Sequence, residues 1–466
     1  MREDMDAKIS YLKYYFLNTS FHGFHFIFES ERHWTERIFW GFCCSLSWLA
    51  SIMLIQTAWN DFRNNAISFV VETSYLEWDT HFPSIAVCET DNQGRISEFT
   101  DETYGNPHDF NFNEIVKELV FFKGLSFYTL QMCGPNATAK HKDCNKKNFV
   151  EFSAEVRSPC SKIFQKCVWN NDEFNCCDFF HMMDTEVGIC FGVNSIQTRN
   201  KKAPRYPMIS NKKTGSGTLR LEIRGIAFVG IYLCNAKKLP GIEQVYLLGE
   251  QEVPTLTTVA TDIIQISPHI HSKRYISIRE IENQPEVKDV SIEQRKCRFT
   301  YENNLDVHHH YSFSACCVDC RKKAQLEMCG CAHHLMPQLT KNLFCDINGL
   351  YCLNKHYNDL IVLKAHWSNR TGLVCDCLPS CTEFEMSVVK DVKFGIKEEF
   401  GVVEISLLRL PSERCKRNVV RGKLDFVVST GGITALFLGA SILSFVEIIY
   451  YFFVRPFGEK DILRQD

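Results

Sequence analysis

Two long apolar segments near the ends of the chain enclose almost all of its cysteines, and this arrangement limits the possible folds more than any other feature. The first segment, 38–57, has twenty residues without a charge, and the second, 424–454, has an uncharged centre from Ile433 to Val446. A helix needs about 20 apolar residues to cross a bilayer. Of the 23 cysteines, 21 lie between the two segments. Because so many cysteines are typical of an oxidising compartment, we expect a membrane protein with a disulfide-rich extracellular domain.

The first apolar segment is predicted to be a transmembrane helix and not a signal peptide. The stretch that precedes it is long, acidic and aromatic, whereas a signal peptide begins with a short basic region. Basic residues follow the second segment at Arg455, Lys460 and Arg464, and this favours a cytoplasmic C-terminus. With two spans, the chain is expected to be a multi-pass protein of the plasma membrane, and both of its termini are expected to lie in the cytoplasm.

Five segments are therefore expected along the chain. They are a cytoplasmic N-terminus (1–36), a first transmembrane helix (37–58), an extracellular domain (59–423), a second transmembrane helix (424–454) and a cytoplasmic tail (455–466).

Glycosylation sequons support the extracellular location of the central domain. Asn136-Ala-Thr138 and Asn369-Arg-Thr371 both match the acceptor motif. Asn18-Thr-Ser20 also matches, but it lies on the expected cytoplasmic side and should stay unmodified.

Most of the extracellular domain is expected to be β-structure. Phe82–Cys88 and the stretches 218–234, 273–300 and 382–410 carry the β-branched or alternating apolar residues that are typical of strands. The stretch 89–160 is polar, and we expect irregular structure there.

The densest cysteine cluster has ten cysteines from Cys316 to Cys381, and it includes an expected helix over Ser314–Met328. Zinc binding is an alternative to disulfides here, because Cys329-Gly-Cys331-Ala-His333-His334 and the run His308–His310 contain suitable ligands. However, the C-x-C spacing differs from that of zinc sites, and the compartment favours disulfides. We therefore expect no metal site, and we expect His308–His310 to form a solvated loop.

Several classes of function are excluded or disfavoured. The net charge of −3 provides no basic face for nucleic acid. The chain has no GxSxG, HExxH or P-loop motif and no GxGxxG motif between a strand and a helix, so we expect no enzymatic activity and no cofactor. Glu447 lies within the second apolar segment, and a carboxylate is costly to bury in lipid, which makes it a candidate functional residue. The alternative is that Glu447 faces water near the inner mouth.

At this point the motifs resemble those of the degenerin/epithelial sodium channel superfamily, most of all its insect pickpocket branch, and they occur in the family's order. They are His22-Gly23 before the first span, the Phe-Pro…Cys strand that ends at Cys88, the Gly188-Ile-Cys190-Phe-Gly-Val-Asn194 element, the thumb cysteines from Cys316 to Cys381, and Gly439-Ala-Ser441-x-x-Ser444-x-x-Glu447 in the second span. The resemblance covers the chain almost from end to end.

The resemblance implies an α+β membrane protein in which two transmembrane helices flank a β-rich extracellular domain with palm, β-ball, finger, thumb (about 297–381) and knuckle. Three subunits, identical or related, would surround one pore in the lipid bilayer. The family's disulfides, carried to matching positions, would join Cys88 to Cys190, Cys167 to Cys176 or Cys177, Cys297 to Cys381, Cys316 to Cys377, Cys320 to Cys375, Cys329 to Cys352 and Cys331 to Cys345. Seven of the 21 cysteines would remain, so one of them cannot pair within the chain.

The same resemblance assigns the pore residues. Gly439, Ala440 and Ser441 would form the selectivity filter, where three copies of small residues present a ring of oxygen dipoles to a partly dehydrated cation. Ser444 and Glu447 would line the pore, with an anionic ring of Glu447 that attracts cations. For Ser444, helix packing through a small side chain is an equally weighted alternative.

Gating residues are also implied. His22 and Gly23 would belong to a re-entrant segment below the filter, with glycine allowing the turn. Eleven residues before Gly439 the family usually has a small residue, but here it is Val428. This bulkier side chain should disfavour closed packing of three helices and give some constitutive opening. The alternatives are a one-residue shift of the alignment or a compensating shape elsewhere.

The expected function is that of a subunit of a sodium-permeable, amiloride-sensitive, non-voltage-gated cation channel with a sensory or epithelial sodium-transport role. The main alternative is a non-conducting auxiliary subunit or surface receptor that requires partner subunits. A nucleotide-gated trimeric channel and an ectoenzyme rank lower.

Overall fold

The computed structural model describes the chain in segments separated by short gaps; these are residues 12–73, 78–106, 108, 111–135, 149–224, 243–382, 385–411 and 413–455. The chain forms two compact units. The first contains residues up to 69, 284–295 and 417 onwards, and the second contains 70–283 and 296–416. Strands β1 (Ile67–Glu72) and β15 (Arg414–Val419) lead from one unit into the other.

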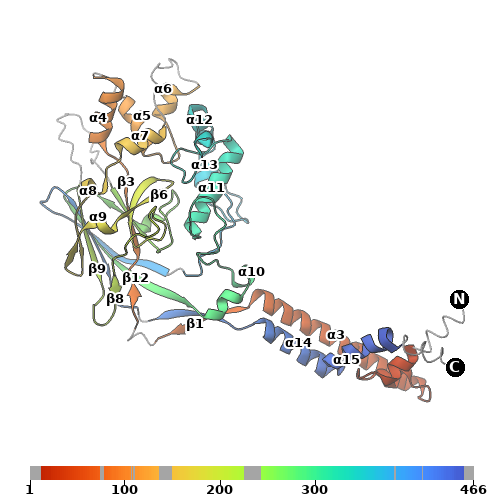
Figure 1. Cartoon of the computed structure of the whole chain (residues 1–466). Coiled ribbons are helices and arrows are strands. Elements are labelled where there is room, and N and C mark those ends of the chain that lie inside the picture. Colours follow the sequence, from red (N-terminus) through yellow and green to blue (C-terminus); the bar gives the residue numbers. More distant parts are fainter. Residues whose placement is uncertain are drawn as a thin grey trace. The chain divides into compact units, whose positions relative to one another are not determined.

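The first unit is built on two apolar helices that lie side by side, α3 (Trp34–Asn64) and α14 (Lys423–Leu438) (Figure 1). By length and composition α3 is able to cross a membrane by itself. Helix α14 meets this test only together with the helical turns that follow it, and the two parts meet at a bend of 72°. The other elements of this unit are α2 (Phe24–Phe28), η3 (Pro285–Asp289), α10 (Ile292–Arg295), α15 (Ile442–Ile449) and the π-helix η5 (Tyr450–Val454).

Helix α3 is longer than the expected span at both ends. It begins after His33, whose side chain accepts a hydrogen bond from the backbone N–H of Thr35. It continues to Asn64 because no glycine or proline interrupts residues 58–64. Near this end, the ring of Phe62 stacks on Phe426 of α14, with ring centroids 5.2 Å apart. The two helices are therefore joined where α3 ends and α14 begins.

Two sheets form the centre of the second unit. In the larger one, β12 (Ile270–Asn283) pairs with β13 (Glu385–Gly395) and, in parallel, with β14 (Gly401–Leu407), and the order continues through β9 (Thr218–Ile223) and β4 (Phe164–Trp169) to β5 (Asp172–Phe174). The other sheet has the order β11 (Ile263–Ile266), β10 (Glu243–Leu248), β3 (Ser84–Glu89), β7 (Gly188–Val193) and β6 (His181–Thr185). Strands β2 (Thr80–His81) and β8 (Ile209–Ser210) form a separate pair.

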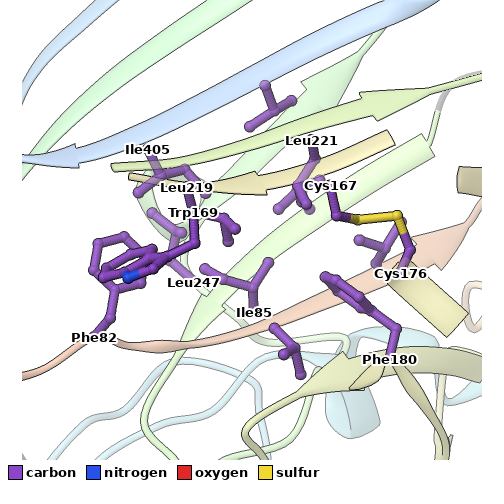
Figure 2. Close-up of a cluster of buried hydrophobic side chains, with 14 of the residues drawn as sticks. Phe82, Ile85, Cys167, Trp169, Cys176, Phe180, Leu219, Leu221, Leu247 and Ile405 are labelled. Atoms are coloured by element: carbon purple, nitrogen blue, oxygen red, sulfur yellow. A yellow bond between two sulfur atoms is a disulfide. The ribbon is translucent and has the colours of Figure 1, made fainter. Parts of the chain in front are cut away.

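A hydrophobic core contains side chains from both sheets (Figure 2). In β9 every second residue is buried, as expected for a strand with one face toward a core. The ring of Trp169 meets Phe82 edge to face, with centroids 4.8 Å apart. The Cys167–Cys176 disulfide joins this core. The strands expected around Phe82–Cys88 and in 382–410 are therefore present, and they supply core residues such as Ile405.

Helices make up the rest of the second unit, and here one expectation was wrong. The stretch 89–160, expected to be irregular, contains α4 to α7 (Figure 1). In α5 the residues Phe112, Ile115, Val116, Leu119 and Val120 are all buried along one face. Polar residues lie between these apolar ones, so the average composition of the stretch is polar although its apolar residues recur with the period of a helix. The bounds are α4 (Gln93–Tyr104), α5 (Asn111–Val120), α6 (Tyr128–Cys133) and α7 (Phe149–Val156).

The cysteine-rich segment forms further helices beside the sheets (Figure 1). The expected helix over Ser314–Met328 is confirmed as α11 (Phe313–Cys329), which ends at Gly330 in a left-handed conformation. The remaining helical elements are η4 (Lys341–Leu343), α12 (Ile347–Lys355), α13 (Tyr357–Ile361), α8 (Cys160–Ile163), α9 (Cys176–Phe179) and η2 (Ala260–Asp262).

Disulfides hold the second unit together in two separate sets. Between residues 88 and 190 they include Cys88–Cys190, Cys160–Cys177 and Cys167–Cys176, and Cys133 is disulfide-bonded as well. Between residues 297 and 381 they are Cys297–Cys381, Cys316–Cys377, Cys320–Cys375, Cys329–Cys352 and Cys331–Cys345. Every pair that the resemblance implies is among them, and Cys167 takes Cys176. Cys329 and Cys331 are thus oxidised and are not zinc ligands.

Candidate ion pathway

The second apolar segment breaks at the residues expected to form the filter. Helix α14 ends at Leu438 and is followed by its C-cap Gly439, whose φ of 65° lies in the left-handed region. Ala440 is buried, and Ser441 begins α15 as its N-cap. The Ser441 hydroxyl accepts a hydrogen bond from the Ser444 backbone, while the Ser444 hydroxyl accepts one from the Ser441 N–H at 3.0 Å. Glycine permits the turn, and the two serines replace backbone partners that the broken helix lacks.

The His22-Gly23 segment contacts this turn directly. The backbone N–H of His22 donates to the Leu438 carbonyl at 2.9 Å. The His22 imidazole packs so closely on Gly439 that a Cβ there would overlap the ring. Gly23 also has a positive φ of 85°, and its lack of a Cβ admits the Cys44 sulfur of α3. Two glycines, 416 positions apart in the numbering, therefore allow the N-terminal segment to reach the break.

Glu447 and Ser444 both contact Ser20, the last residue of the Asn18-Thr-Ser20 sequon. The backbone N–H and the hydroxyl of Ser20 lie 3.2 Å and 3.0 Å from Oε2 of Glu447. The Ser20 and Ser444 hydroxyl oxygens are 2.6 Å apart. Ser444 is buried within the chain, whereas Glu447 is half-buried. The motifs of the sequence could not predict these contacts of Ser20, because its partners lie more than 420 positions away in the chain.

Val428 lies on α14, separate from the filter contacts. Its side chain is 65% exposed. The neighbouring Val427 is exposed to a similar extent. In this part of the unit, Arg421 pairs with Asp61 at 3.7 Å.

Buried histidines in the second unit are isolated from solvent. His308 was expected in a solvated loop, but it is buried, and burial lowers its pKa to about 4. Burial also lowers the pKa of His334 to about 4, while its Nε2 lies 2.6 Å from the Leu119 carbonyl of α5. The adjacent His333 packs beside Phe122, with ring centroids 5.1 Å apart. These histidines are neutral packing groups at neutral pH, and within the described segments no cluster of three or more potential ligands could hold a metal.

A buried ion pair links helix α11 to the sheets. Arg321 and Glu186 are both fully buried, and an Arg321 nitrogen lies 2.5 Å from the Glu186 carboxylate. Arg321 also donates to the Leu360 carbonyl at 2.9 Å, and the backbone N–H of Leu256 donates to Glu186 at 2.8 Å. Because a buried charge without a partner is costly, these contacts fix α11 against the turn between β6 and β7.

The two sequons expected outside the cell begin at Asn136 and Asn369. Asn369 is exposed in the loop after α13, as a glycan acceptor must be. Asn136 lies outside the described residues.

Comparison with known proteins identifies the family. A sequence model described as the amiloride-sensitive sodium channel matches residues 15–451, nearly the whole chain. The chain belongs to this family. It is 23% identical to pickpocket protein 28 of Drosophila melanogaster, over 97% of this chain and 80% of that protein. It is 22% identical to sodium channel protein Nach of Drosophila ananassae, over 94% of this chain and 85% of that protein.

Amiloride-sensitive sodium channels are an ion channel family and not an enzyme family, and the resemblance noted from the sequence is therefore confirmed. A human relative, the bile acid-sensitive ion channel, is 22% identical over 94% of this chain and 85% of its own length. Membership supports a cation channel subunit of the plasma membrane.

Proposed function

We propose that the chain is a pore-forming subunit of a sodium-permeable, amiloride-sensitive, non-voltage-gated cation channel with a sensory or epithelial role. Three copies, identical or related, would surround the pore in the lipid bilayer, with both termini in the cytoplasm. The main support is the contact between His22 and the turn at Gly439. An N-terminal segment folded against a helix break is unnecessary for a simple membrane anchor, but it gives a filter turn a defined shape.

The proposed mechanism uses oxygen dipoles and one charge. Three copies of the Gly439–Ser441 turn would offer oxygens close enough to replace part of the hydration shell of a cation. On the cytoplasmic side, three Glu447 carboxylates would concentrate cations and repel chloride, because charges act strongly where water is scarce. His22 and Gly23 would hold the turn from below.

Two-electrode voltage clamp of oocytes that express the chain tests this proposal. We expect an inward current in sodium that disappears when a large organic cation replaces sodium and that amiloride blocks. Surface protein is measured in parallel through the glycan expected at Asn369. Surface protein without current, both alone and with pickpocket subunits, would contradict the proposal and favour an auxiliary or receptor role.

Val428 provides a test of gating within the same assay. Val428→Ala should reduce the constitutive current, because a smaller side chain lets three helices pack more closely in the closed state. Val427→Ala is the matched control, since it removes the same atoms from a neighbouring exposed position. An unchanged basal current in Val428→Ala, or an equal fall in the control, would contradict this role.

A further inference from the structure

Ser20 makes contacts that suit a specific task in the pore. Two of its donors, the backbone N–H and the hydroxyl, point to the same oxygen, Oε2 of Glu447, at 3.2 Å and 3.0 Å. Both contacts go to one oxygen, so Oε1 remains the oxygen better placed to meet a cation. Hydrogen bonds to a carboxylate are stronger than those between neutral groups. Ser20 therefore fixes the rotation of the carboxyl group.

The proton count limits what the Ser20 hydroxyl can donate. A serine hydroxyl has one proton to donate, and an ionised carboxylate only accepts. The Ser20 hydroxyl is placed to donate its one proton either to the Ser444 oxygen at 2.6 Å or to Oε2 of Glu447 at 3.0 Å, and its backbone N–H donates to Oε2 in both cases. The Ser444 oxygen in turn accepts from the Ser441 N–H at 3.0 Å. A continuous chain of hydrogen bonds then connects the filter turn to the carboxylate.

Neighbouring contacts hold Ser20 in place. Two residues later, the His22 N–H is bonded to the Leu438 carbonyl. The ring of Phe21 lies 6.4 Å from Phe445 of α15 and 6.4 Å from Trp48 of α3, measured between centroids. The segment is thus packed against both helices, so the Ser20 contacts do not depend on its own hydroxyl alone.

We propose that Ser20 is a positioning residue that orients Glu447 beside the filter turn and thereby sets the cation selectivity of the pore. The inference rests on the proposed channel function. A carboxylate held at a fixed distance favours cations of one size, whereas a freely rotating one adapts to several.

The functional test compares Ser20→Ala with Ser20→Thr, which retains a hydroxyl. Sodium-to-potassium permeability ratios come from reversal potentials, which a change in protein amount does not move. We expect the ratio to fall by roughly tenfold in Ser20→Ala, as for the loss of one hydrogen bond to a charged group, and to stay near the wild-type value in Ser20→Thr. Thr19→Val is the control, because the Thr19 hydroxyl contacts Tyr15 and not Glu447. An unchanged ratio in Ser20→Ala, or an equal fall in Thr19→Val, would overturn the inference.

A double variant separates positioning from a direct effect. If Ser20 acts through Glu447, Ser20→Ala should change the ratio no further in a channel that already carries Glu447→Gln. An additional change of the same size as in the wild type would refute this role.

Cross-linking tests the contact without requiring current. Both sets of disulfides named above lie wholly to one side of Val259 and Ala260, which are exposed, so a protease site placed there separates the N- and C-terminal fragments on a non-reducing gel. Ser20→Cys with Ser444→Cys should join the fragments under mild oxidation, whereas Thr19→Cys with Ser444→Cys should join them much less. Absence of the cross-link overturns the inference whatever the current. A cross-link in a chain that never conducts contradicts the channel proposal instead, and with it the role in selectivity.

Discussion

Substitution of Gly439 by alanine tests the filter turn most directly. The added methyl group meets two obstacles in the structure. Gly439 has a φ of 65°, which an L-residue adopts only at a cost, and the new Cβ would overlap the His22 ring. Either obstacle would disturb the turn, and here they act together.

The size of the effect follows from both obstacles. A left-handed backbone costs an alanine about 1–2 kcal/mol. Displacement of His22 also weakens its hydrogen bond to Leu438, which is worth about 0.5–1.5 kcal/mol. Together they destabilise the turn by about 1.5–3.5 kcal/mol, or roughly 10- to 400-fold in its population.

The assay is sodium current divided by surface protein, measured beside a matched control. Gly431→Ala adds the same methyl group to the same helix, but among the described residues no atom beyond the adjoining backbone of α14 lies within 4 Å of the added Cβ. Alanine should there stabilise the helix by about 1 kcal/mol. We expect at least a tenfold loss of normalised current in Gly439→Ala and little loss in Gly431→Ala.

Two results would refute this reasoning. Normal current and selectivity in Gly439→Ala would mean that neither the left-handed turn nor the His22 contact matters for conduction. An equal loss in Gly431→Ala would mean that any added bulk in α14 is harmful, whatever its position relative to the turn.

The remaining predictions concern the extracellular domain. Because burial lowers the pKa of His334 from 6.5 to about 4, the unfolded chain takes up the proton first as the pH falls. His334 alone should therefore lower the free energy of unfolding by about 2 kcal/mol between pH 8 and pH 5, in addition to the contribution of His308. Thermal unfolding of the purified channel measures this decrease, and an equal pH dependence in His334→Gln would contradict the assignment to His334. Glu186→Gln leaves buried Arg321 without its counter-charge and should lower the free energy of unfolding by about 3–5 kcal/mol, seen as a loss of surface protein. Asp184→Asn, which breaks an exposed ion pair, should lower it by less than about 1 kcal/mol. Similar amounts of surface protein for the two variants would argue against a stabilising role of the buried pair. Asn369→Gln should abolish one glycosidase-sensitive gel shift, and an unchanged shift would place this loop away from the lumenal side.

Apolar length and cysteine number are local signals that predict the organisation of this protein from its sequence alone. A run of twenty uncharged residues suffices to predict a helix, because the bilayer thickness sets its length. The disulfide pairs came from resemblance and not from spacing, and the same is true of the residues at the filter. In each case the signal was local: a motif, a run of apolar residues or a turn glycine.

Tertiary structure decided what local signals do not contain. The burial of His308 depends on the elements that cover it, and the helices of 89–160 depend on an apolar face that the overall polarity concealed. The role proposed for Ser20 depends on contacts with Glu447 and Ser444, which lie more than 420 positions away. A sequence pattern records periods along one segment, whereas such contacts exist only once separate segments have packed together.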